Sequence, residues 1–158
     1  MSVYIHFFIR RGDEFIPLGD YSRNSIIYSI ANSYVIWEKV RPLSKNDIEQ
    51  MISEAEHRQR AYKTEIAGIK VKIAQLKDLS CTWNEALEYL DEYEEAIQEF
   101  EQDIKEARYA KHFFGFLIDI IETIQYADKK EYDYNNYIYA GIEIGAPTVG
   151  DIINDAAR

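Results

Sequence analysis

This sequence has one cysteine and no long apolar run. Cys81 is the only cysteine, so no disulfide can form within the chain, and the cytoplasm is the expected setting. No apolar run approaches the roughly 20 residues that a membrane-spanning helix needs. The N-terminal segment alternates like a strand and carries its basic residues after the apolar run, the reverse of a secretory signal. We therefore expect no membrane partner.

Motifs for catalysis or metal binding are also missing. The three histidines, His6, His57 and His112, are far apart in the sequence, and Glu54 with His57 gives only one of the two ExxH motifs that a di-iron bundle requires. Cys81 has no histidine near it in the sequence to act as a base, and the sequence has no glycine-rich phosphate-binding loop. We therefore predict that the protein is not an enzyme and has no catalytic residues, metal ligands or cofactor.

Positive charge is scarce in the second half of the chain. The net charge is −10, and residues 81–111 alone hold ten acidic and three basic side chains, which gives −7. Residues 112–158 add −5, whereas residues 1–44 and 45–80 each carry +1. Nucleic-acid binders gain affinity by neutralising phosphates with Lys and Arg, so this distribution predicts no direct binding to nucleic acid. It favours a protein partner with a basic surface, or it serves solubility alone.

A heptad pattern of apolar residues is abundant instead. Over residues 48–76 the seam positions follow one another in steps of four and three, and only Gln59 is polar. The same alternation runs over residues 83–121 with one interruption at Lys111. The other positions are mostly Glu, Lys, Gln and Arg, which favour helices. The pattern predicts two long helices that pair as a coiled coil.

Capping residues mark the N-terminal ends of these two helices. Ser44 and Asp47 resemble a capping box, and Thr82 and Glu85 have its S/T-x-x-E pattern. The connection between the helices is then only three or four residues long, which makes them antiparallel neighbours. The helical hairpin is expected to occupy residues 44–111.

The sequence patterns of the two terminal segments, residues 1–43 and 112–158, predict that they fold together as a small compact unit, the head. Residues 22–37 have the pattern of a short amphipathic helix, and residues 110–127 are apolar on nearly all sides, which predicts a buried helix. Strand-like alternation or strand propensity occurs at residues 2–10, 15–18 and 136–145. The predicted fold is α+β and mostly helical, with a long antiparallel coiled-coil hairpin inserted in a head of three antiparallel strands plus helices, all in a single domain (residues 1–158).

Two parts of the hairpin are candidate protein-binding sites. Acidic side chains recur at helical spacing on the second predicted helix, and four of them form the first candidate: Glu88, Glu92, Glu95 and Glu99. At the turn, Trp83 either seals the end of the hairpin core or belongs to an exposed apolar tip. In the second case Leu79, Trp83 and Leu87 dock a partner or a second copy of the chain, giving a homo-oligomer.

A further candidate site lies in the head, where arginines and tyrosines are compatible with binding a phosphate or a nucleotide. Its residues are Arg10, Arg11, Arg23, Tyr134 and Tyr137. Tyrosine gives recognition surfaces a large contact area with adaptable hydrogen bonding. The alternatives are arginines that pair with the chain's own acidic residues, and tyrosines that cover an edge strand.

These observations lead to three functional hypotheses. The first is a non-enzymatic protein-binding module that inhibits a host protein by engaging its basic, nucleic-acid-binding face. The abundance of Ile, Tyr, Asn and Lys indicates an AT-rich genome, which fits a bacterial virus or another mobile element. The alternatives are a self-assembling coiled-coil structural protein and a protein that sequesters a small ligand or nucleotide.

Overall fold

A computed structural model describes residues 3–11, 14–35, 40–80, 86–126 and 138–144. The chain divides into two compact units. The sheet unit comprises residues 1–54 and 110–158, and the helix-pair unit comprises residues 55–109. The sequence placed the corresponding boundaries at residues 43/44 and 111/112, and the assignment of one domain stays a prediction.

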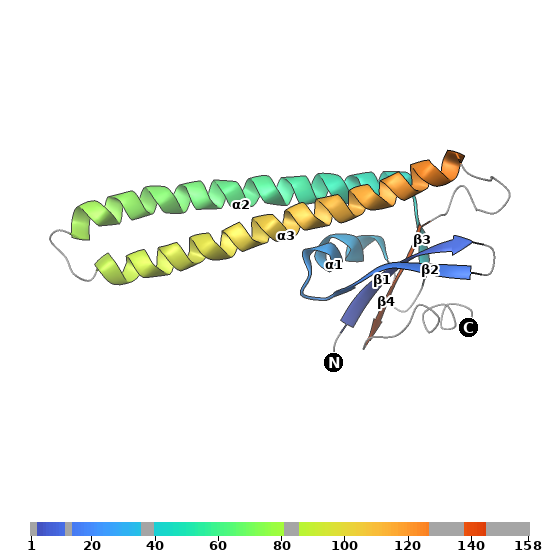
Figure 1. Cartoon of the computed structure of the whole chain (residues 1–158). Helices are drawn as coiled ribbons and strands as arrows, with labels where there is room; N and C mark the ends of the chain where they lie inside the picture. The colour runs from blue at the N-terminus through green and yellow to red at the C-terminus, as the bar shows by residue number, and fades with distance from the viewer. Residues whose placement is uncertain (1–2, 12–13, 36–39, 81–85, 127–137, 145–158) are drawn as a thin grey trace. The chain divides into compact units, whose positions relative to one another are not determined.

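The sheet unit contains a four-stranded antiparallel sheet with the strand order β2-β1-β4-β3 (Figure 1). Its strands are β1 (Val3–Arg11), β2 (Glu14–Ser22), β3 (Arg41–Leu43) and β4 (Ile138–Ile144). The sequence predicted three strands, and β3 is the one that it missed. Three residues are too few for a recognisable alternation, and Pro42 argues against a strand except at a sheet edge, where β3 lies.

One face of the sheet packs on helix α3 (Ala86–Tyr126) through aromatic rings. Phe7 of β1 is fully buried, and its ring centroid lies 5.1 Å from that of Phe113. Tyr21 of β2 contacts the same ring at 4.8 Å. Gly19 pairs with Phe7, and a Cβ atom there would lie 2.9 Å from the Tyr21 ring and 3.2 Å from the Phe113 ring. The close approach of these three rings therefore requires a residue without a side chain at position 19.

The β1–β2 pairing contains a one-residue register shift. Phe8 pairs with Pro17, and the next residue of β1 toward the N-terminus, Phe7, pairs with Gly19. Leu18 is therefore an extra residue in β2, as in a β-bulge. Because side chains alternate between the faces of a strand, the extra residue reverses which β2 side chains share a face with β1 beyond this point.

Helices account for most of the described residues. Helix α1 (Ile26–Ala31) and the 3₁₀-helix η1 (Asn32–Tyr34) lie within the predicted helical segment 22–37. The Ser25 hydroxyl caps α1 by accepting a hydrogen bond from the N–H of Ile27 at 3.1 Å. In none of the described ranges is a helix both long and apolar enough to cross a membrane.

Helix α2 (Lys45–Ser80) begins with the capping box that the sequence predicted. The N–H of Asp47 donates to the Ser44 hydroxyl at 3.0 Å, and the N–H of Ser44 donates to the Asp47 carboxylate at 3.1 Å. The box thus gives acceptors to two N–H groups that have no backbone partner within the helix. The second predicted box, Thr82 with Glu85, lies outside the described residues, and the described part of α3 begins at Ala86.

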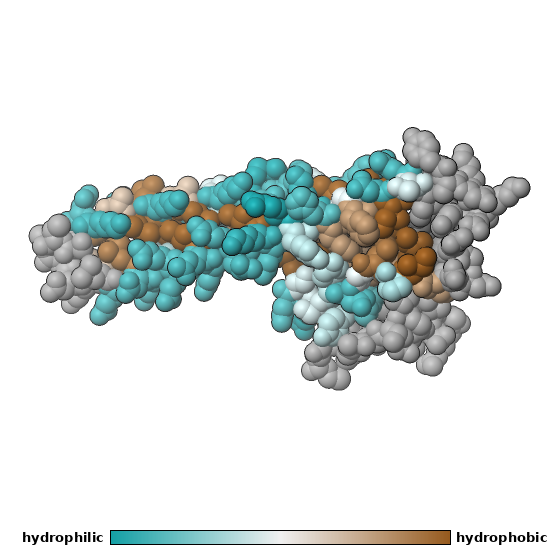
Figure 2. Space-filling view, in the orientation of Figure 1, coloured by the Kyte–Doolittle hydropathy of each residue, from teal (hydrophilic) through white to brown (hydrophobic). Residues whose placement is uncertain are grey.

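In the helix-pair unit, α2 and α3 lie side by side and run in opposite directions (Figure 1). The rings of Tyr62 and Phe100 lie 6.0 Å apart, and Lys72 Nζ lies 5.9 Å from the Tyr93 ring centroid. Residue numbers therefore rise along α2 as they fall along α3. Apolar residues line the contact and are buried: Ala55, Ile66, Ile69, Leu90, Ile104 and Ala107. Figure 2 shows this apolar strip between two hydrophilic margins. The predicted long helix pair is confirmed.

The expectation that residues 110–127 form a helix buried on nearly all sides is wrong, because one side of its described part is exposed. Phe113, Phe114 and Leu117 are buried, but Phe116 is 47% exposed. Phe116 follows Phe114 by two residues, which places it about 200° around the helix axis from that fully buried ring. The covering elements thus bury one side of this segment and leave the side of Phe116 accessible.

Alanine should stabilise the protein at Gly68 and destabilise it at Gly19. Gly68 lies inside α2, where a Cβ atom would have no neighbour within 4 Å, so alanine should add about 0.5–1 kcal/mol through helix propensity. At Gly19 the added methyl group must displace aromatic rings, which typically costs about 1–3 kcal/mol. Urea unfolding gives both free energies, and shifts of the same sign would contradict the packing described here.

Removal of the α2 cap should also be measurable. Ser44→Ala should lower the free energy of unfolding by about 1 kcal/mol, because the N–H of Asp47 loses its acceptor. Ser53→Ala is the matched control, since Ser53 is exposed in the interior of the same helix. Equal unfolding midpoints for the two variants would show that the cap contributes nothing.

Candidate protein-binding surface

The contact with α2 fixes the rotation of α3 in the helix-pair unit. Leu90, Ile104 and Ala107 are buried on one side of α3. Four glutamates follow one another in steps of four, three and four residues, on the opposite side of the helix from Leu90 and Ile104: Glu88, Glu92, Glu95 and Glu99. All four are exposed. We call these four residues the acidic face.

The acidic face has no basic partner in the described parts of the chain. None of its four carboxylates takes part in an ion pair or hydrogen bond among the described residues. One ion pair between α2 and α3 lies in the sheet unit, where Lys45 Nζ is 3.3 Å from Glu122 Oε1. In the helix-pair unit, Lys72 lies over the ring of Tyr93. The negative charge of the acidic face is therefore available to another molecule.

The charge density along this part of α3 is close to that of a nucleic-acid strand. Residues 88–106 contain nine acidic residues and one lysine, which gives a net charge of −8. These 19 residues span about 28 Å at 1.5 Å per residue, or one net charge per about 3.5 Å. One strand of duplex DNA carries a charge every ~3.4 Å. A surface that binds nucleic acid through its phosphates meets a similar linear charge here.

The two helices of this unit differ in the sign of their charge. Residues 55–80 of α2 contain six basic and three acidic side chains, a net charge of +3. Arg60, Lys63 and Lys70 are exposed on this helix. A basic partner is therefore attracted to α3 and repelled by the basic part of α2, so the charges define an orientation as well as a site.

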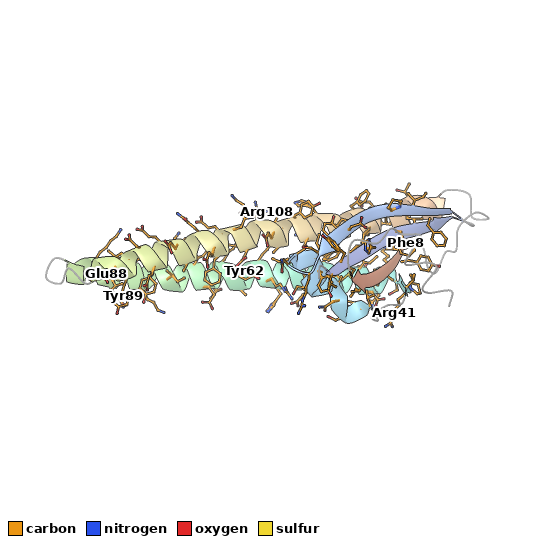
Figure 3. All side chains as sticks on the ribbon, turned by 90° about the horizontal axis from the view of Figure 1, so that it is seen from below. Phe8, Arg41, Tyr62, Glu88, Tyr89 and Arg108 are labelled. Carbon is orange, nitrogen blue, oxygen red and sulfur yellow. The ribbon has the colours of Figure 1, made fainter. Side chains whose placement is uncertain are left out.

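Tyr89 is an exposed aromatic residue beside the acidic face that the sequence reasoning missed. It lies next to Glu88 in the first described turn of α3 and is 55% exposed (Figure 3). Its position three residues before Glu92 makes the two side chains neighbours on the helix surface. The signal in the sequence is a tyrosine outside the heptad positions. Exposed tyrosines are frequent anchors in protein interfaces.

The predicted tip site falls largely outside the description. Leu79 lies in the last turn of α2 and Leu87 in the first turn of α3, but the description covers neither side chain. Trp83 lies outside the described residues altogether. A protein-binding tip formed by these three residues therefore stays a prediction.

The arginines of the predicted phosphate site are not brought together. Arg10 pairs with Phe15 near the turn between β1 and β2, whereas Arg23 follows the other end of β2 and donates its N–H to the carbonyl oxygen of Val3 at 2.8 Å. Arg10 lies seven residues after Val3, which corresponds to about 23 Å along a strand. Arg11 lies beside Arg10, and the description omits both side chains. Tyr134 and Tyr137 lie outside the described residues.

Within the described ranges, no group of three or more His, Cys, Asp and Glu side chains is arranged to hold a metal ion. His57 and Glu54, the one ExxH pair in the sequence, are both exposed on α2. Comparison of the whole chain with protein-family models, curated proteins and solved structures finds no match.

Proposed function

We propose that the protein is a non-enzymatic protein-binding module, and that its acidic face binds the basic, nucleic-acid-binding surface of another protein. The observation that carries the proposal is the acidic face, a row of four exposed carboxylates without partners in the described chain. It lies on a stretch of α3, residues 88–106, whose net charge per length is close to that of a nucleic-acid strand. Binding to this face blocks the partner's nucleic-acid site, so the module acts as a competitive inhibitor.

Rigid presentation supports this role. We infer that the helix pair is a continuous coiled coil, because the heptad positions of α2 and α3 meet along the contact that Tyr62 and Phe100 make. A helix holds its carboxylates at fixed spacing, so little backbone entropy is lost when a partner binds. A flexible acidic segment with the same charge would lose far more.

Electrostatic attraction and aromatic contact supply different parts of the binding. Exposed charges mainly raise the association rate and orient the partner, and salt screens them over a Debye length of ~10 Å at 0.1 M. Slow dissociation requires desolvated contacts, which are typically made by Tyr, Trp or Arg. Tyr89, beside Glu88 and Glu92, is placed to supply such a contact.

Reversal of charge on the acidic face should weaken binding without harming the fold. The variant Glu92→Lys, Glu95→Lys, Glu99→Lys should weaken partner binding at least about tenfold, because attraction becomes repulsion. The immobilised protein captures its partner from a bacterial lysate at about 0.05 M salt, and the complex should dissociate at about 0.5 M salt.

The control variant carries the same charge change elsewhere, at Glu49, Glu65 and Asp119, which are also exposed. It should capture the same partner as the unmodified protein. An equal loss of partner capture in both triple variants would show that the binding depends on the net charge of the protein and not on the acidic face. Capture that does not change with salt would rule out the acidic face as the binding site.

Tyr89→Ala should weaken the same complex by about tenfold or more, mainly through faster dissociation, because the aromatic contact is lost while the charges remain. Tyr109→Ala is the matched control. Tyr109 lies on the same helix and is equally exposed, at 57% against 55%, but lies ten residues beyond Glu99. Surface plasmon resonance with the captured partner separates the two rates. Equal dissociation rates for the two variants would remove Tyr89 from the interface.

A further inference from the structure

The acidic face offers hydrogen-bond acceptors and no donors. An ionised carboxylate accepts hydrogen bonds only. Over residues 88–99 of α3, the exposed side chains that carry a donor are those of Tyr89 and Gln98. At 3.6 residues per turn, each of them lies about 90° around the helix from the centre of the acidic face. A molecule that contacts this face therefore meets a row of negatively charged acceptors, as it does along the phosphates of a nucleic acid.

Base edges present a different chemistry. Adenine, cytosine and guanine each expose an amino donor as well as acceptors. Proteins that read the base sequence therefore include Asn, Gln, Asp or Glu among their contacts. Placed against the acidic face, an Asp or Glu would meet carboxylates of like charge, and an amide oxygen would find no donor. The acidic face thus reproduces the hydrogen-bonding properties of phosphates and not those of bases.

The acidic face also lies on a convex surface. Leu90 and Ile104 are buried on the opposite side of α3, so the four glutamates lie on the outer side of a helix about 10–12 Å across. Sequence-specific proteins commonly insert a helix or a β-ribbon into the major groove, between two rows of phosphates. The outer side of one helix has no groove to receive such an element. The surface that fits it is flat or concave.

Helix α2 does not supply a second row of negative charge beside the acidic face. Arg60, Lys63 and Lys70 are exposed on the part of α2 that lies in the helix-pair unit, and residues 55–80 carry a net charge of +3. A protein that spans a groove of a duplex contacts phosphates on both sides of that groove. Such a protein would meet basic side chains on the helix next to α3. Binding is therefore confined to one row of carboxylates.

We propose that the partner binds nucleic acid through its phosphates and does not read the base sequence. Its contact surface is a flat or concave strip of Lys and Arg side chains and backbone N–H groups, which are the donors that phosphates accept from. The strip matches the row from Glu88 to Glu99, which spans about 16 Å at 1.5 Å per residue. This inference rests on the proposed function, because it names the class of nucleic-acid-binding protein that the acidic face inhibits.

A selection experiment tests whether the partner reads sequence. The partner is captured by the full-length chain, released at about 0.5 M salt and returned to about 0.1 M salt. It is then bound to a pool of DNA duplexes whose central positions are random, and the bound duplexes are sequenced after several rounds. Their composition should stay that of the starting pool, because phosphate contacts carry no sequence information. An enriched motif would overturn the inference and leave the proposed function standing.

Competition with a polyanion that has no bases separates the two claims further. Inorganic polyphosphate and the random duplex pool are each titrated into the complex of the full-length chain with its captured partner. Both should release the partner, at concentrations of negative charge that agree within about threefold, because both compete through charge. Release by the duplexes alone would overturn the inference. Release by neither would overturn the proposed function itself, because the acidic face and nucleic acid would then not share a surface.

A glutamine variant tests the same inference on this chain. Glu92→Gln, Glu95→Gln, Glu99→Gln keeps the length of the side chains and an acceptor oxygen in each, but it removes the charges and adds donors. A surface built for phosphates should bind this variant about tenfold or more weakly. Exchange to the matching amides at the three positions of the charge-reversal control should leave binding unchanged. Full binding of the first variant would show a partner that uses neutral hydrogen bonds, and would overturn the inference.

Discussion

Burial of the apolar strip between α2 and α3 is the constraint on which the helix-pair unit depends. Ile66 and Ile69 on α2 and Leu90 and Ile104 on α3 are removed from water by it. A half-turn rotation of α3 would expose its two residues, each of which contributes about 1.5–3 kcal/mol when buried, and would bury carboxylates without partners. The side chains that hold the pair together therefore also direct the acidic face outward.

In the sheet unit, one extra residue has a comparable effect. Leu18 shifts the β1–β2 register, which lets Asp20 reach His6 while Gly19 makes room for the rings of Tyr21 and Phe113. Strand β2 therefore has contacts on both faces of the sheet. On one face Tyr21 packs on Phe113 of α3, and on the other Asp20 contacts His6 of β1, whose Nε2 atom is unpaired.

Sequence reasoning predicted the elements that have a repeating pattern, and it missed the features that depend on single residues. Heptad spacing predicted the helix pair, and Ser44 with Asp47 marked the start of α2. The three-residue strand β3 was missed because it is too short to show alternation. The pairing of His6 with Asp20 depends on a bulge, and hydrophobic alternation does not show where a strand gains a residue. Arg10 and Arg23 were grouped by charge, although the hairpin register separates them.

Competition between the acidic face and nucleic acid can be measured directly. A short DNA duplex is titrated into the complex of the protein with its captured partner, and the sedimentation of each labelled component is followed at constant salt. If α3 occupies the nucleic-acid-binding surface, the duplex displaces the protein and no species contains all three molecules. A stable ternary complex, with affinities that do not depend on each other, would contradict a shared surface.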